Sequence, residues 1–200
     1  MVVTGIIGEK LAIEKLREEI PSIKWQDLLN NKHVKDYDII GKNKMGKSIK
    51  IQVKTIKSGN WSLHMKKFLL FDREKLKLKK PEQWITGINT KLKETINFFI
   101  FVYLEGFFEK EPELKNDGIF IRFNKLEPKF YIIDTESLQR LLKKEHSRWL
   151  IKKEHKRPKN PFSFHSGLSK EDLEEYESKW EIIEKDFRLS LSKRKDVGEE

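Results

Sequence analysis

The chain has 200 residues, of which 37% are hydrophobic and 37% charged, and its 13 Phe, 5 Trp and 4 Tyr are enough to fill a core, which excludes disorder throughout. There is no cysteine, so a disulfide framework and a thiolate zinc site are both excluded. No apolar run approaches the roughly 20 residues that cross a bilayer, and the first residues do not resemble a signal peptide. We therefore expect a cytoplasmic protein without a membrane partner.

The net charge is +10, and the positive charge is unevenly distributed. The segment 39–71 contains eight lysines and no acidic residue, and the segment 140–159 contains nine Lys or Arg against two Glu. These segments carry net charges of +8 and +7, which leaves the rest of the chain at −5. Segregated positive charge is typical of a polyanion-binding surface. A generally lysine-rich proteome produces the same enrichment, so charge alone leaves both interpretations open.

The first quarter of the chain contains a predicted helix and a predicted hairpin. Residues 6–20 have helical periodicity up to Pro21, and 22–29 is a short strand or loop around Trp25. Residues 37–40 and 48–56 are predicted to pair as antiparallel strands across a turn that contains Gly46. Side chains alternate along the second strand, with one face apolar and the other polar: Ile49, Ile51 and Val53 against Lys50, Gln52 and Lys54.

The remaining elements follow in chain order. We expect a strand within 61–71, a helical turn at 91–96, and a buried central strand at 98–104, which is the most apolar stretch. Shorter strands are expected at 119–123 and 130–133. A helix capped by Thr135 is predicted to run to about Lys153. A last helix opens at Ser169, with Asp172 three residues on, and carries one apolar stripe: Leu173, Tyr176, Trp180, Ile183 and Phe187.

Glu9 is an acidic residue on the apolar stripe of the first predicted helix. At 100° per residue it falls within the arc of Ile6, Ile13 and Leu16. A carboxylate facing a core is costly unless it is paired with a cation or a hydrogen-bond donor. Glu9 is therefore predicted either to have a charged, polar or metal partner or to lie at a helix start, where the helix dipole favours a negative charge.

Asp38, Gln52 and Lys54 are the polar residues that the predicted hairpin brings together. Asp38 directly precedes the apolar pair Ile39 and Ile40, and the other two lie on the polar face of the next strand. Pairing across the turn places an acid, an amide oxygen and a lysine close together, which suits a hard divalent cation. By spacing alone, an ordinary hairpin with a solvated polar face is the favoured interpretation of this pattern.

The pattern resembles the PD-(D/E)XK nuclease superfamily, in which a helix bears a Glu, one strand opens with an Asp, and the next contains Glu or Gln, any residue, then Lys. The residues that carry the resemblance are Glu9, Asp38 and the run Gln52-Val53-Lys54, within 5–61. The family includes type II restriction enzymes and archaeal Holliday-junction resolvases. The resemblance implies an α/β, restriction endonuclease-like core with a central mixed sheet flanked by helices. We expect this core in residues 1–135, a basic helical C-terminal region in 136–190 packed on it, and a polar tail in 191–200.

The resemblance also implies roles for individual residues. Asp38 would be the central metal ligand, Gln52 would ligate through its side-chain oxygen, and Val53 through its backbone carbonyl. Lys54 would hold the attacking water, and Glu9 would bind a second metal or a metal-bound water. The implied cofactor is Mg²⁺, with Mn²⁺ as a substitute. Gln52 departs from the acid that most members have, and Asp36 competes with Asp38 for the ligand position.

These residues imply a Mg²⁺-dependent deoxyribonuclease, of restriction or defence type, acting on duplex or branched DNA as a homodimer. A Holliday-junction resolvase or repair nuclease and a catalytically silent DNA-binding protein are the alternatives. An RNA-binding module lacks a recognisable aromatic signature. Trp61 is weighed as a core residue or as a DNA contact. Candidate DNA contacts are Lys50, Lys57, Asn60, Trp61, Lys144, Arg148 and Lys152.

Overall fold

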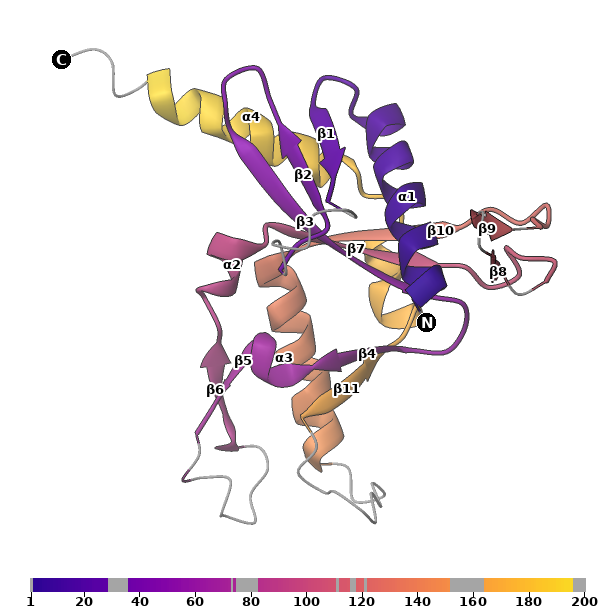
Figure 1. Cartoon of the computed structure of the whole chain (residues 1–200). Coiled ribbons are helices and arrows are strands. Elements are labelled where there is room, and N and C mark those ends of the chain that lie inside the picture. Colours follow the sequence, from indigo (N-terminus) through magenta and orange to yellow (C-terminus); the bar gives the residue numbers. More distant parts are fainter. Residues whose placement is uncertain are drawn as a thin grey trace.

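The computed structural model describes residues 2–28, 36–72, 74, 83–110, 112–115, 118–120, 122–151 and 164–195. The protein is α/β, with a mixed five-stranded sheet in the order β1-β2-β3-β7-β10 between helices (Figure 1). The elements of this core are α1 (Val2–Glu19), β1 (Lys24–Asp27), β2 (Ile39–Lys42), β3 (Ser48–Ile56), β7 (Phe98–Tyr103), β10 (Lys129–Asp134), α3 (Thr135–Ile151) and α4 (Glu181–Lys195).

The smaller strands form three separate two-stranded sheets. Strand β4 pairs with β11, β5 with β6 and β8 with β9, each pair antiparallel. In chain order they are β4 (Trp61–His64), the 3₁₀ turn η1 (Met65–Lys67), β5 (Leu69–Phe71), β6 (Ile85–Ile88), α2 (Leu92–Thr95), β8 (Glu113–Lys115), β9 (Gly118–Phe120), β11 (His165–Leu168) and the 3₁₀ turn η4 (Glu171–Tyr176). No described helix is long and apolar enough to cross a membrane.

The hairpin of β2 and β3 forms as the alternation of β3 predicts, with β3 bounded by Ser48 and Ile56. The strands are antiparallel with Ile39 opposite Ile51, and the turn between them uses Gly46 at φ 79°. Strand β2 begins at Ile39, so Asp38 lies just outside it rather than inside the predicted strand 37–40. On its other side β3 runs parallel to β7, which makes the sheet mixed.

Strand β7 is the buried centre that its composition predicts, because all six of its side chains are buried. Successive side chains of β7 point to opposite faces of the sheet and join two different hydrophobic clusters. Phe98 and Ile100 join the cluster that contains α1 and α4, and Phe99 and Phe101 join the one that contains α3, β4 and β11. Gln52 pairs with Phe99 in register and therefore belongs on the α3 side of the sheet.

The C-terminal part of the chain differs from its prediction in two places. Its region contains a strand, β11, which pairs with β4 of the preceding segment, so it is not helical throughout. The single apolar helix expected from Ser169 is split into η4 and α4 at Ser178, whose φ is 55° and whose N–H donates to the Phe130 carbonyl. The split sends Leu173 to the α3 face of the sheet and Trp180 to the α1 face.

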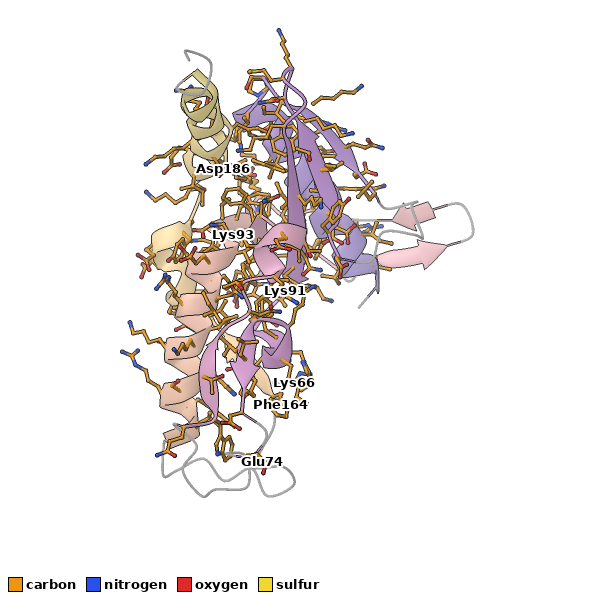
Figure 2. All side chains as sticks on the ribbon, turned by 90° about the vertical axis from the view of Figure 1, so that its left-hand side faces the viewer. Lys66, Glu74, Lys91, Lys93, Phe164 and Asp186 are labelled. Carbon is orange, nitrogen blue, oxygen red and sulfur yellow. The ribbon has the colours of Figure 1, made fainter. Side chains whose placement is uncertain are left out.

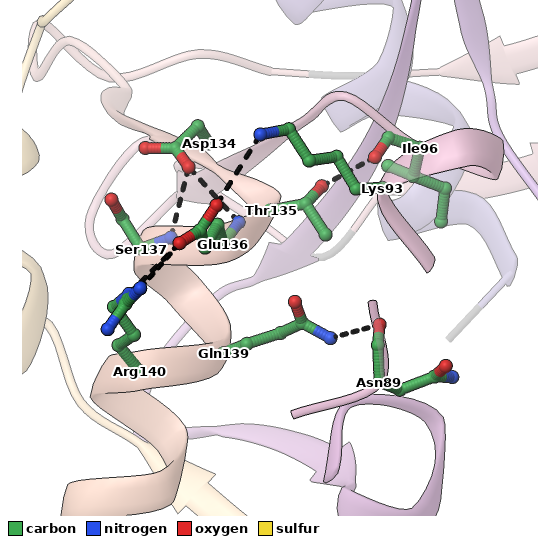
Figure 3. A network of polar contacts seen from close by, with 9 residues as sticks. All are labelled: Asn89, Lys93, Ile96, Asp134, Thr135, Glu136, Ser137, Gln139 and Arg140. Carbon is green, nitrogen blue, oxygen red and sulfur yellow. Dashed lines mark hydrogen bonds and ion pairs between the residues drawn. The ribbon is translucent and has the colours of Figure 1, made fainter. Parts of the chain in front are cut away.

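Helix α3 begins at Thr135, but its cap is the preceding residue. The Asp134 carboxylate accepts hydrogen bonds from the N–H groups of Glu136 and Ser137, both at 3.0 Å, whereas the Thr135 hydroxyl donates to the Ile96 carbonyl at 2.6 Å (Figure 3). The predicted Thr135 cap is therefore wrong by one residue. The buried Thr135 instead ties the helix start to the segment that precedes β7.

Candidate metal centre

The candidate centre lies beside β3, just before β2 begins at Ile39. The N–H of Asp38 donates to the Ile51 carbonyl at 2.9 Å, and the Asp38 carboxylate accepts the Val53 N–H at 2.7 Å. The carboxylate thus takes the place of a strand partner for the Val53 N–H. Among the described strands, none pairs with β3 on this side beyond Ile51.

Backbone direction along β3 aims one carbonyl at this edge. Alternate residues of a strand direct their N–H and C=O groups to opposite sides. The Ile51 carbonyl and the Val53 N–H both bond to Asp38, so the Val53 carbonyl points to the same side. This places a backbone oxygen beside the Asp38 carboxylate, as a metal-ligand role for Val53 requires.

Asp38 and Glu9 are both held in surroundings that oppose their ionisation. Burial raises the pKa of Asp38, while the Val53 N–H and the charges of Lys54 and Lys67 act in the lowering direction. For Glu9, burial first and then the negative charge of Asp38 raise the pKa to about 7. The Asp38 carboxylate therefore disfavours the charged form of Glu9, and a cation between the two would relieve this repulsion.

The position of Glu9 agrees with the helical projection. It is partly buried on α1, one residue after Gly8, where an added Cβ would lie 1.8 Å from the Thr55 hydroxyl oxygen. That close approach of α1 to β3 brings the Glu9 carboxylate within electrostatic reach of Asp38 and Lys54. The helix-start alternative does not apply, because α1 begins at Val2.

Gln52 and Lys54 project from β3 toward the α3 side of the sheet. Gln52 is buried at 6% exposure, and its amide oxygen accepts a hydrogen bond from the Lys67 ammonium at 3.0 Å. Lys54 is partly buried and lowers the pKa of both Glu9 and Asp38. The polar face of the hairpin is therefore not the solvated surface that an ordinary hairpin would present.

Two charged residues near the candidate centre belong to no motif that sequence analysis could recognise. Lys67, on η1, contacts Gln52 and is close enough to Asp38 to lower the pKa of that carboxyl group. Asp27, at the end of β1, contributes to the raised pKa of Glu9. Asp36, which competes with Asp38 in the sequence, is exposed and raises the pKa of Lys67. The lysine-rich character of 39–71 was the one signal that included Lys67.

The oxygen donors carried by these residues are of types that suit a hard divalent cation. Two carboxylates, one amide oxygen and one backbone carbonyl are the ligand types that Mg²⁺ and Mn²⁺ accept, with water completing the shell. Within the described residues, no three His, Asp or Glu side chains gather as a metal site. A bound ion would consequently depend on the neutral oxygens of Gln52 and Val53 as well as on Asp38 and Glu9.

Trp61 is a core residue. Its side chain is 2% exposed and makes an edge-on contact with the Phe101 ring, and its indole N–H donates to the Lys54 carbonyl at 3.0 Å. A buried ring cannot stack on a DNA base, so this structure excludes the DNA-contact interpretation of Trp61. Its role is instead to fix the backbone of β3 at Lys54.

The other candidate DNA contacts lie on two surfaces. Lys50 lies over the Tyr37 ring, 5.4 Å from its centroid, and Lys57 is partly buried. Asn60 and Arg148 are 88 positions apart but line one polar cleft of about 630 Å³. Arg148 also pairs with Glu145 at 2.8 Å, while Lys144 is exposed on α3. Lys152 lies outside the described residues.

Comparisons with known proteins leave the geometry as the basis for function. No protein-family model matches the chain, and no curated protein matches it significantly.

Proposed function

We propose that the chain is a divalent-metal-dependent DNA endonuclease of restriction or defence type, with the restriction endonuclease-like fold and a PD-(D/E)XK-type centre. The observation that carries the proposal is the pair of partly buried carboxylates, Glu9 and Asp38, of which Asp38 accepts the Val53 N–H at 2.7 Å at the edge of β3, close to Lys54. Buried charges that destabilise one another are costly, and such clusters occur preferentially at functional sites. The basic segment around β3 supplies the positive charge that a DNA substrate needs.

The chain's own residues have separate tasks in this proposal. Asp38, the Gln52 amide oxygen and the Val53 carbonyl hold the metal, and Glu9 adds negative charge from α1. When bound, the metal neutralises charge on the scissile phosphate and lowers the pKa of the attacking water. Lys54 donates a hydrogen bond to that water and orients it for in-line attack. Val53 stays in place because its N–H is held by Asp38.

A catalytically silent DNA-binding protein is the second candidate, and one contact favours it. Gln52 carries no charge, and its oxygen already accepts the Lys67 ammonium. A centre with one acid fewer binds metal more weakly. This candidate predicts salt-dependent DNA binding that changes neither with Mg²⁺ nor in Asp38→Asn. A junction resolvase or repair nuclease would use the same centre and differ in the preferred substrate, and a homodimer would supply the two centres that a double-strand cut needs.

Cleavage assays separate these candidates. Purified wild-type protein is incubated with supercoiled plasmid, a four-way junction and single-stranded DNA, each with and without Mg²⁺. We expect Mg²⁺-dependent cleavage that falls about 10²–10⁴-fold in Lys54→Met. Lys24→Met is the matched control, because Lys24 is exposed on β1, and it should cut like wild type. Failure of the folded protein to cut any substrate, or full activity of Lys54→Met, would contradict the proposal.

A further inference from the structure

Lys67 is a second lysine of the candidate centre, and its side chain is directed into the centre rather than to solvent. Its ammonium lies 3.0 Å from the Gln52 amide oxygen and is partly buried. Its neighbour Lys66 is exposed and lies over the Phe164 ring, 4.1 Å from the centroid (Figure 2). Two adjacent lysines thus have opposite environments, and only one of them contacts the centre.

The backbone of Lys67 is held by a buried network of amide groups. The Asn89 side-chain amide donates to the Lys67 carbonyl at 3.0 Å. The Gln139 amide, on α3 and 1% exposed, donates to the Asn89 carbonyl at 2.7 Å (Figure 3). It also donates to the Phe68 carbonyl at 2.8 Å. A fully buried amide that bonds two loop carbonyls fixes η1 against α3. The place of Lys67 is therefore imposed by the core and not by a mobile surface chain.

The position of Lys67 affects the balance of charge in the candidate centre. The centre holds two carboxylates, Glu9 and Asp38, and two ammonium groups, Lys54 and Lys67. Asp38 and Lys54 each interact electrostatically with the other three of these groups. Gln52 adds an oxygen without adding charge. An amide oxygen has two lone pairs, of which the Lys67 ammonium takes one. Another divalent cation at the Gln52 end would therefore meet a neutral ligand and a fixed positive charge.

We propose that the Lys67 ammonium supplies the positive charge at the Gln52 end of the centre for which a second divalent cation would otherwise be needed, so that the chain binds one divalent ion. This inference rests on the proposed nuclease function and assigns the metal stoichiometry of the same centre. It also explains why residue 52 is a Gln and not an acid, because an acid there would form an ion pair with Lys67. Lys67 is a positioning and charge-balancing residue, and its effect is measured on metal binding.

Calorimetric titration with Mn²⁺ alone tests the inference without relying on activity. We expect wild type to bind one Mn²⁺ per chain. Lys67→Met removes the repelling charge and should bind Mn²⁺ on the order of tenfold more tightly, or take up a second ion. Lys67→Arg keeps the charge and should behave like wild type. Lys66→Met removes a charge one position away and is the matched control, with no change expected. Circular dichroism confirms that each variant is folded.

The outcomes separate this inference from the proposed function. Two Mn²⁺ ions bound by wild type, or Lys67→Met binding Mn²⁺ as Lys66→Met does, overturns the role of Lys67 even where wild type cuts DNA. Wild type that neither binds Mn²⁺ nor cuts, together with a Lys67→Met variant that does bind, overturns the nuclease and the stoichiometry of one ion per chain. Absence of Mn²⁺ binding in both proteins overturns both.

Discussion

Two polar clusters lie on either side of η1, and they differ in how their buried groups are compensated. In the candidate centre, burial raises the pKa of both Glu9 and Asp38, and the negative charge of Asp38 raises the pKa of Glu9 further. In the amide network, Gln139 and Asn89 are neutral and bond to backbone carbonyls at 2.7–3.0 Å. The first cluster costs stability and the second contributes it. The comparison contrasts a candidate centre whose charges are poorly compensated with a frame of amide groups whose hydrogen bonds are satisfied.

The amide network should give the larger stability effect when it is broken. Gln139→Leu keeps the volume of the side chain but removes the donor to the Phe68 and Asn89 carbonyls. Because both carbonyls keep one backbone partner, we expect a loss of about 2 kcal/mol in the free energy of unfolding rather than collapse of the fold. Urea denaturation measures this loss.

Mutation at the nearby helix start is the control for this effect. Arg140→Ala breaks an exposed pair with Glu136 at 2.6 Å on the same helix, and such pairs contribute well under 1 kcal/mol. Equal destabilisation by Gln139→Leu and Arg140→Ala would mean that the network is not a structural frame, and the comparison would fail.

In the candidate centre, removing a charge should raise the free energy of unfolding instead of lowering it. A carboxyl whose pKa rises from 4.5 to about 7 on folding holds its proton more tightly in the folded state. Its stabilising contribution is complete below pH 4.5 and is lost as the pH rises through about 7. Without metal, Glu9→Gln should therefore match wild type near pH 4 and be more stable by about 1–2 kcal/mol at pH 8, after allowance for partial exposure.

Glu14→Gln is the matched control for Glu9, because Glu14 is exposed on the same helix. Unfolding curves at pH 4 and pH 8 are compared for wild type and both variants. A Glu9→Gln variant that is no more stable than Glu14→Gln at pH 8 would show that the Glu9 carboxylate is not strained in the metal-free protein.

Local periodicity predicted the parts of the centre that one element contains. Alternation set the bounds of β3 and the side of Gln52 and Lys54, and the helical projection placed Glu9 on the buried stripe. Lys67 was missed because its role depends on η1 and on contacts with Asn89 and Gln139 far along the chain. No local pattern distinguishes it from the exposed Lys66.

The same limit explains the errors in the fold. The stripe from Leu173 to Phe187 has continuous helical spacing, but the chain crosses at Ser178 from one face of the sheet to the other, and tertiary packing breaks the helix there. Trp61 follows a lysine-rich strand in the sequence, which made it a candidate DNA contact. Its burial against Phe101 is decided by β7, which lies about 40 positions later.

Asp38→Asn tests the central claim most directly. It removes the negative charge of the side chain that accepts the Val53 N–H, and it retains a side-chain oxygen that can still accept this hydrogen bond. The measurement is the rate of plasmid cleavage in Mg²⁺, with the unfolding midpoint of the metal-free protein recorded beside it. The account predicts that cleavage falls by about 10³-fold or more while the metal-free protein is at least as stable as wild type. Wild-type cleavage by Asp38→Asn would contradict it.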